Sequence, residues 1–346
     1  MRLTHCSVLL FCTAILLTGL KPCASGQGYV ITHYNSGNGI GHDLVKTITA
    51  DSSGFIWMAT WDGLTRYDGT DFVNYFHDPA DSNTIPYFAV STVVIDNYDN
   101  LWLATDNAMF TLFNRSTGKF SRLKSIGGHS LNDLVCFNSG PDGYIWIVLG
   151  HGILKYHPVS RETLYYPWKP GTDENPAMPF FSYSLIFSEN SDPWLTGSDI
   201  ISLELGNDRS NGERYASIKT RNELRRLPGR VGTFFNFVGN GAIVNDTLGN
   251  LWLASMTGLF RYDQDACRFT EYGDDFGRIR FTGDRPVVFY NHDTGLHISF
   301  PGRDSTVTIP AETCGLPSAC FMQDPGLLWF SKSGSGGTPS GVVKVV

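Results

Sequence analysis

The chain has 346 residues, of which 42% are hydrophobic, 13% are aromatic and only 17% are charged. Its formal net charge is −7 and its Lys and Arg residues form no stripe, which argues against nucleic acid as a partner. The 37 glycines supply backbone conformations that many tight turns require. We therefore expect a globular protein with many short strands and turns.

The N-terminus predicts a signal peptide. Arg2 supplies a positive charge, Ser7 to Leu20 is an apolar run too short to span a bilayer comfortably, and small residues follow it. We expect residues 1–26 to be removed on export and residues 27–346 to form the mature protein. The sequence predicts no membrane span in the mature chain, and hence a periplasmic or secreted protein.

A strand-turn-strand unit recurs along the rest of the chain. Its first copy reads DSSGFIWMATWDGLTRYDG from Asp51 to Gly69 and contains an apolar strand, a polar turn and a return strand. The first six copies each have an anchor aromatic and an apolar residue seven positions later, as in Trp57 and Leu64, and the seventh has a longer Gly/Ser turn after its anchor. The anchors are Trp57, Trp102, Trp146, Trp194, Trp252, Phe289 and Trp329. Seven units of about 45 residues predict an all-β fold, a seven-bladed β-propeller with four-stranded blades.

The two ends of the chain predict how the ring closes. The last repeat ends at Gly341–Val346 without an outer strand, and Tyr29–Tyr34 is a spare strand before the first repeat. We expect this N-terminal strand to pair with the last blade, which closes the ring and hides two exposed strand edges. The charged stretch from Gly206 to Arg230 is expected to be a solvated loop between the fourth and fifth blades.

Four cysteines lie beyond the signal region: Cys136, Cys267, Cys314 and Cys320. A local disulfide between Cys314 and Cys320 stays open in an exported chain. The favoured interpretation makes Cys136 and Cys320 small buried strand residues. None of the cysteines has the spacing of a zinc site, and the sequence predicts neither a metal nor a cofactor.

The turns between the second and third strands of the repeats predict a ligand site. In a propeller these turns share one mouth with the starts of the innermost strands. A sugar needs an aromatic face for its C–H surface and planar polar groups for its hydroxyls. Trp61 stands out as a tryptophan in a polar turn rather than at an anchor. The candidate ligand-binding residues are Trp61, Asp62, Asp106, Asn107, His151 and Asp199.

These candidates have plainer interpretations, which stay open. Trp61 then packs against a neighbouring loop or a missing partner domain. Asp62, Asp106 and Asp199 then serve only the geometry of their turns. No residue is predicted to be catalytic.

The pattern D-x-x-G-x-I-W-x-x-T-x-x-G-L-x-R-Y-D at Asp51–Asp68, and more loosely at Asn245–Asp263, resembles the two-component regulator propeller repeat. The resemblance implies the periplasmic sensor region of Bacteroides-type hybrid two-component receptors. It implies an oligosaccharide ligand and a second propeller or other sensor domain as partner. The sequence shows no kinase, receiver or helix-turn-helix motif, so we expect either a fragment of such a sensor or a stand-alone propeller.

Two other function classes stay open. A protein-interaction scaffold would dock a partner on the ring, and Tyr165, Tyr166 and Trp168 are expected as exposed aromatics that support it. An enzyme similar to the streptogramin lyases, which are also propellers, would use a His base beside a bound Mg²⁺. The histidines expected at the mouth are His42, His151 and His292. No compact His/Glu constellation accompanies them, and we expect no enzyme.

Overall fold

The computed structural model describes residues 30–107, 109–169, 184–188, 191–196, 199–207, 212–223, 236–237, 243–245, 250–255, 258–263, 268–272, 287–291, 294–299, 306–324, 327–333 and 340–346. The predicted signal peptide lies outside these ranges. Within them nearly all regular structure is β-strand, and the helical elements are the 3-10 turn η1 (Ser36–Asn38) and the short α1 (Ala311–Cys314). The prediction of an all-β chain is confirmed. None of the described helices is long and apolar enough to cross a membrane.

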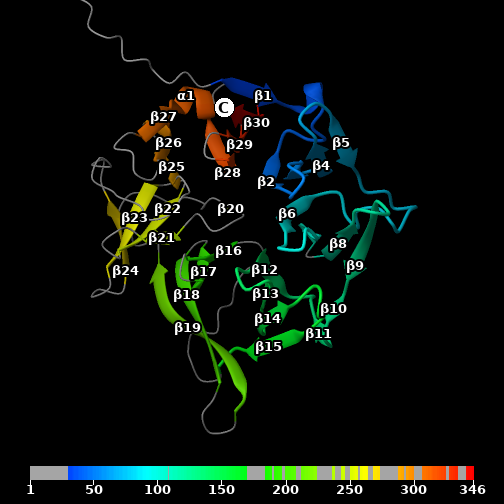
Figure 1. Ribbon diagram of the computed structural model, residues 1–346, viewed down its shortest axis with the longest axis vertical. Helices are drawn as coiled ribbons and strands as arrows, with labels where there is room; N and C mark the ends of the chain where they lie inside the picture. The colour runs from blue at the N-terminus through cyan, green and yellow to red at the C-terminus, as the bar shows by residue number, and fades with distance from the viewer. Residues whose placement is uncertain are drawn as a thin grey trace, which may run out of the picture.

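Strands that follow one another in the chain pair antiparallel, and each group forms its own sheet (Figure 1). Sheet 1 contains β2 (Val45–Ala50), β3 (Ile56–Thr60), β4 (Gly63–Tyr67) and β5 (Phe72–Tyr75). Sheet 2 contains β6 (Val90–Ile95), β7 (Leu101–Thr105), β8 (Phe110–Asn114) and β9 (Lys119–Leu123). A hairpin of β10 (Ser125–Ile126) and β11 (His129–Ser130) leads to sheet 3. Sheet 3 contains β12 (Leu134–Ser139), β13 (Ile145–Leu149), β14 (Gly152–Tyr156) and β15 (Thr163–Pro167).

The second half of the chain continues this arrangement. Sheet 4 contains β16 (Ser184–Phe187), β17 (Pro193–Thr196), β18 (Asp199–Asn207) and β19 (Arg214–Glu223). Sheet 5 contains β21 (Ile243–Asn245), β22 (Leu251–Ser255), β23 (Gly258–Asp263) and β24 (Arg268–Tyr272). Sheet 6, as far as it is described, contains β25 (Val287–Asn291), β26 (Gly295–Ser299) and β27 (Thr306–Ile309).

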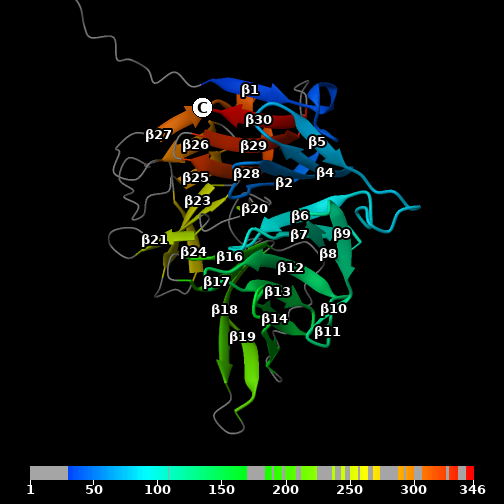
Figure 2. The same ribbon diagram turned by 45° about the vertical axis from the view of Figure 1, so that its right-hand side comes forward.

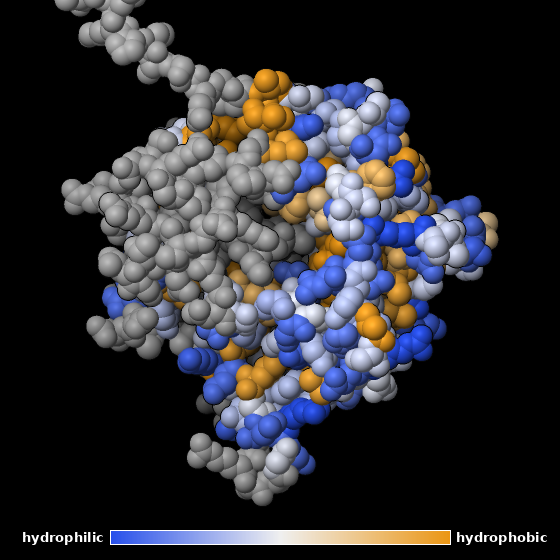
Figure 3. All heavy atoms as spheres, in the orientation of Figure 1, coloured by the Kyte–Doolittle hydropathy of each residue, from blue (hydrophilic) through white to orange (hydrophobic). Residues whose placement is uncertain are grey.

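Sheet 7 joins the two ends of the chain. It contains β28 (Leu316–Asp324), β29 (Leu327–Ser333) and β30 (Gly341–Val345), and β1 (Ile31–Tyr34) pairs antiparallel with β30. The backbone amides of Val30 and Val346 each donate to the other residue's carbonyl at 3.0 Å. Both valines are exposed, with fractions of 65% for Val30 and 58% for Val346. Figure 3 shows hydrophobic atoms at the surface in the region of β1 and β30. The expected pairing of the N-terminal strand with the last repeat is therefore present.

Sheet 7 also receives a strand that the sequence does not predict. The short β20 (Asn236–Phe237) pairs parallel with β28, opposite Ala319 and Cys320. It lies between sheets 4 and 5 in the chain but near the centre of the molecule in Figure 1. The segment that links these two sheets therefore reaches the inner strand of a sheet on another side.

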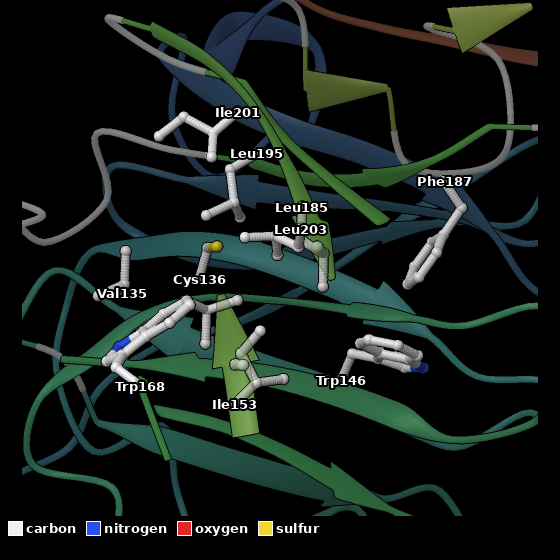
Figure 4. Close-up of a cluster of buried hydrophobic side chains, with 12 residues drawn as sticks. Val135, Cys136, Trp146, Ile153, Trp168, Leu185, Phe187, Leu195, Ile201 and Leu203 are labelled. Atoms are coloured by element: carbon white, nitrogen blue, oxygen red, sulfur yellow. The ribbon is translucent and has the colours of Figure 1, made fainter. Parts of the chain in front are cut away.

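Apolar side chains pack between neighbouring sheets. Figure 4 shows the cluster between sheets 3 and 4, where Trp146, Trp168, Leu185 and Phe187 are buried together. Comparable clusters join sheet 1 to sheets 2 and 7, sheet 2 to sheet 3, and sheet 6 to sheet 7. Every residue of β3, β7 and β13 is buried. These second strands are therefore buried on both faces, which explains their continuous apolar sequence.

The spacing of the repeat has a hydrogen-bonding cause. Asp51 Oδ2 accepts from Trp57 Nε1 at 2.8 Å, and Asp96 Oδ2 accepts from Trp102 Nε1 at 2.8 Å. The other oxygen of Asp51 accepts from the backbone amides of Ser53 and Phe55. One carboxylate thus closes the turn and satisfies the indole N–H of the buried anchor. A buried N–H without such a partner would be costly, so the aspartate and the tryptophan recur together.

The expectation of a loop from Gly206 to Arg230 is wrong for a large part of that stretch. Strands β18 and β19 form a long hairpin in which Asn207 lies opposite Arg214, and the hairpin projects from the body of the molecule in Figure 2. Alternation is the reason, because Ala216 and Ile218 of β19 pack against the cluster between sheets 3 and 4. The charged residues obscured this period of two.

The structure also bears on the expectations for Trp168 and for the cysteines. Trp168 is not an exposed aromatic: it is only 9% exposed and donates from Nε1 to the Leu149 carbonyl at 3.2 Å. Cys136 in β12 and Cys320 in β28 are buried free thiols, as favoured, and burial raises the pKa of both. The side chain of Cys314 lies outside the described part of the structure.

Candidate functional site

The turns after the second strands lie beside the starts of the innermost strands in the first three sheets. The amides of Trp61, Asp106 and Gly150 donate to the carbonyls of Leu44, Ala89 and Asp133, each at 3.0 Å. These contacts have the same place in sheets 1, 2 and 3. We call this end of the described sheets the turn face. In each of these three sheets the turn and the strand start therefore lie at the same end.

Trp61 and Asp106 are brought together by a residue that the sequence analysis did not select. The ammonium of Lys46, in β2, lies 2.7 Å from both carboxylate oxygens of Asp106 in the next sheet. The same ammonium lies 4.5 Å from the ring centroid of Trp61, within cation–π distance. Asp106 therefore holds Lys46, and Lys46 covers one face of the indole. Trp61 nevertheless remains 45% exposed.

Asp62 and Asn107 are exposed in the same two turns but have different surroundings. The Asp62 backbone amide donates to Thr60 Oγ1 at 3.2 Å, while its carboxylate has no hydrogen bond or ion pair with the described residues. Asn107 Oδ1 accepts from Thr105 Oγ1 at 2.6 Å. The Asn107 side chain therefore shapes its own turn, and the Asp62 carboxylate is available to accept a hydrogen bond from a ligand.

His151 belongs to a second cluster on the turn face. Its Nδ1 lies 2.6 Å from Oδ2 of Asp133, and the Tyr165 hydroxyl donates to its backbone carbonyl at 2.9 Å. The ring of Tyr165 stacks on that of His129 with centroids 3.9 Å apart. Burial, and then the charge of His151, lower the pKa of His129. His151 is therefore held by its neighbours and is not an isolated turn residue.

Asp199 is the remaining candidate. It begins β18, and its side chain lies outside the described part of the structure. The structure therefore brings the candidate residues into two groups, one around Trp61 and one around His151. The sequence patterns do not indicate Lys46, His129 or the hydrogen bond of Tyr165 as parts of these groups. Lys46 could have been found from the sequence, because it is a charged residue in the otherwise uncharged strand β2. The contacts of Tyr165 with His129 and His151 follow only from the fold.

Apolar side chains add to the surface around Trp61. Leu44, Phe76 and Phe88 are each at least 40% exposed, and the Phe88 carbonyl accepts from the Gly63 amide at 2.6 Å. The ring of Tyr87 lies 4.2 Å from that of Phe88. Gly63 has a φ of 86° and its Cα faces the Tyr75 carbonyl too closely for a Cβ atom. The turn that presents Trp61 therefore depends on glycine.

The same region has little of the geometry that metal binding or catalysis requires. The described residues contain no group of three or more His, Cys, Asp or Glu side chains that could hold a metal ion. The His151–Asp133 pair is a dyad of the kind that can orient a general base. Among the described residues, the His151 imidazole has no hydrogen-bond partner other than Asp133.

Comparison with protein-family models finds no match, and comparison with curated proteins finds none. Solved structures do resemble this chain. The extracellular domain assigned to the hybrid two component system BT3049 of B. thetaiotaomicron aligns with a TM-score of 0.59 and 19% identity, over 92% of this chain and 42% of that one. Virginiamycin B lyase from Staphylococcus aureus aligns with a TM-score of 0.52 and 14% identity, over 92% and 99%. PorZ, a surface component of the type-IX secretion system of Porphyromonas gingivalis, aligns with a TM-score of 0.55 and 16% identity, over 89% and 47%.

The fold is propeller-like. At these identities the likeness bears on the fold alone, and it agrees with the nearly all-β structure of consecutive small sheets. The chain spans less than half of the BT3049 domain and of PorZ, and nearly all of the lyase. The structural neighbours thus include an extracellular domain assigned to a two component system, a secretion component and an enzyme.

Proposed function

We propose that this chain is an exported seven-bladed propeller, with its ring closed by the pairing of β1 with β30, that acts as the ligand-sensing part of a two-component receptor. Its ligand in this proposal is an oligosaccharide, and its partner is a second propeller or another sensor domain. The repeat pattern and the structural likeness to the extracellular domain assigned to a hybrid two component system of B. thetaiotaomicron support the proposal. The packing of sheet 7 against both sheet 1 and sheet 6 supports the closed ring.

One observation carries the ligand part of the proposal. Trp61 is a half-exposed indole on the turn face, and Lys46 covers one of its faces. The other face is left to stack on the C–H surface of a sugar ring. The unpartnered carboxylate of Asp62, next in the chain, accepts hydrogen bonds from hydroxyl groups. A fixed aromatic platform beside a free planar acceptor is the combination that sugar binding uses.

The signalling step follows from differential binding. A ligand shifts an equilibrium only as far as its affinities for the two states differ. The sheets pack against one another through large buried side chains, so the propeller offers a preformed site. The sugar therefore favours one arrangement of this propeller relative to its partner domain, and the moving part lies at that junction.

Thermal unfolding of the purified protein with a panel of defined oligosaccharides tests this function. A ligand that binds only the folded state stabilises it by about 2.7 kcal/mol at a hundredfold excess over Kd. We expect one glycan class to raise the unfolding midpoint, and Trp61→Ala to abolish the rise. Tyr98→Ala is the matched control, because Tyr98 is 42% exposed in a turn at the opposite end of sheet 2. A folded protein that responds to no glycan would refute the proposal.

A docking role is the second candidate. The exposed Leu44, Phe76 and Phe88 around Trp61 favour it, since adjoining exposed apolar side chains mark interaction sites. In that case Trp61→Ala weakens binding of a partner domain and leaves glycan titrations flat. We propose no enzymatic role, because the His151–Asp133 dyad lacks further catalytic groups among the described residues.

A further inference from the structure

The charges around Trp61 restrict the chemical class of its ligand. On the described turn face, Asp43, Asp62, Asp106 and Asp133 lie beside or within the turns and strand starts that surround Trp61 and His151. Lys46 is the one lysine or arginine among these turn, strand-start and inner-strand residues of sheets 1 to 3. Carboxylates therefore outnumber fixed positive charges among these turn, strand-start and inner-strand residues.

The one ammonium is already engaged. Lys46 contacts both oxygens of Asp106 at 2.7 Å and the Trp61 ring at 4.5 Å. An anionic sugar that contacted Lys46 would have to share the ammonium with Asp106, whose carboxylate already offsets its charge. A site that pairs its own charges in this way presents little positive potential to a ligand.

The nearby histidines do not replace this charge. His42 Nδ1 accepts a hydrogen bond from the Leu44 amide at 3.0 Å, so that nitrogen is already engaged within the chain. His151 Nδ1 is paired with Asp133 at 2.6 Å. Burial, and then the charge of His151, lower the pKa of His129, which disfavours its charged form. Near Trp61 and His151, these three imidazoles therefore offer little positive charge to a ligand.

Asp62 adds a negative charge to the turn that presents Trp61. It follows Trp61 directly, is exposed, and its carboxylate has no partner among the described residues. An ionised carboxylate accepts hydrogen bonds but donates none. It can therefore accept hydrogen bonds from the hydroxyls of a sugar stacked on Trp61, and it repels a carboxylate or sulfate on that sugar.

We infer that the Trp61 site is selective for uncharged oligosaccharides and rejects uronate and sulfated ones. The inference rests on the proposed function, because it specifies the ligand class of the same site. The selectivity arises from Asp62 and from the neutralisation of Lys46 by Asp106. Removal of the Asp62 charge should therefore reduce the preference for uncharged over anionic oligosaccharides.

Calorimetric titration of the purified protein with matched pairs of glycans tests this selectivity. Each pair has the same linkage and length and differs only in oxidation at C6: β-1,4-mannotetraose with tetramannuronate, cellotetraose with tetraglucuronate, and α-1,4-galactotetraose with tetragalacturonate. In low-salt buffer at pH 7 we expect the neutral member of the binding pair to bind at least about tenfold more tightly. Added salt narrows the ratio, because it screens the repulsion.

Asp62→Asn provides the second measurement. It preserves the shape and one acceptor oxygen but removes the charge, and we expect the ratio to fall at least about threefold. Asp68→Asn is the control, because it removes the same charge at the opposite end of sheet 1, beyond β4. A uronate that binds as tightly as its neutral partner, or an unchanged ratio in Asp62→Asn, overturns the inference alone. Absence of binding by every glycan to a folded protein overturns the proposed function together with it.

Discussion

The aspartate of the repeat acts through several hydrogen bonds at once. Asp96 is 5% exposed, and its carboxylate accepts from Trp102 Nε1, from the amides of Tyr98 and Asn100, and from the Asn100 side chain, all between 2.8 and 2.9 Å. Its loss leaves a buried indole N–H and a turn without their acceptor. Such residues should contribute far more to stability than the aspartates of the turn face.

Substitution of Asp96 by alanine tests this contribution. We expect Asp96→Ala to lower the free energy of unfolding by about 3 kcal/mol, because buried donors left unsatisfied cost about 1–3 kcal/mol each. Asp62→Ala should change it by less than about 0.5 kcal/mol, since its carboxylate is exposed and unpartnered. Urea unfolding of both variants gives the comparison. Equal losses would mean that the hydrogen bonds of Asp96 do not stabilise the turn.

Two histidines make stability depend on pH. Burial, and then the positive charge of Lys332, lower the pKa of His33, and burial followed by the charge of His151 lowers that of His129. Both start from an ordinary value of 6.5. Below that pH the unfolded chain binds protons more readily than the folded one, so this contribution to stability is present above pH 6.5 and is lost as the pH falls through the folded pKa values.

We therefore expect the midpoint temperature of thermal unfolding to decrease as the pH is lowered from about 7 to about 5. The variant with His33→Gln and His129→Gln should show a smaller fall over the same interval. Thermal scans in buffers of constant ionic strength provide the measurement. A slope that is the same in the variant and in the parent protein would exclude these two groups as its source.

At the scale of elements, β1 is joined to sheets 7 and 1 by its last residue. Tyr34 lies 6.0 Å from Trp329 and 5.4 Å from both Tyr67 and Phe72, measured between ring centroids. Its hydroxyl lies 3.1 Å from that of Tyr67, and burial and this contact raise the pKa of Tyr67 to about 12. One side chain thus ties the N-terminal strand to both sheets.

Tyr34→Ala measures what this contact contributes. We expect a loss of about 2–4 kcal/mol in the free energy of unfolding, because a large aromatic leaves a packed cluster. Val159→Ala is the control, since Val159 is 66% exposed in a turn of sheet 3. Chemical unfolding followed by tryptophan fluorescence reports both values. A loss no greater than that of the control would mean that β1 is held by its backbone pairing alone.

At the scale of the whole molecule, the two described chain ends lie side by side. Val30 and Val346 exchange two backbone hydrogen bonds of 3.0 Å. If a closed ring of seven blades is the native arrangement, a covalent link at this point adds no strain. The ring can then be opened elsewhere, at an exposed loop, without loss of the fold.

A circular permutant tests the closed ring. Residues 346 and 30 are joined by a short Gly/Ser linker, and new ends are placed between Pro79 and Ala80, which are both exposed. We expect cooperative unfolding with a midpoint at or above that of the parent. New ends between Ile147 and Val148, both fully buried in β13, should abolish folding. Failure of the first permutant to unfold cooperatively would contradict closure through β1 and β30.

The sequence by itself predicted the repeated hairpins and their anchors. It did so because local chemistry specifies them: the aspartate, the turn glycine and the indole lie within a few residues of one another, and their hydrogen bonds close inside one turn. It also located the turn that presents Trp61. The pairing of β1 with β30 was predictable because each end of the chain has a strand with an unpaired edge, and pairing the two strands covers both edges.

Only the tertiary structure decided which of these turns act together. Lys46 meets Asp106 across 60 positions of sequence, and β20 pairs with β28 on another side of the molecule. The outer strand β19 was not predicted from the sequence. Its apolar residues Ala216 and Ile218 are buried only because they pack against the neighbouring sheet. Contacts between sheets depend on how twisted sheets are placed beside one another, and that placement leaves no local pattern in the residues that meet. The hairpins are therefore determined by sequence, whereas the surroundings of Trp61 are determined by the packing of the sheets.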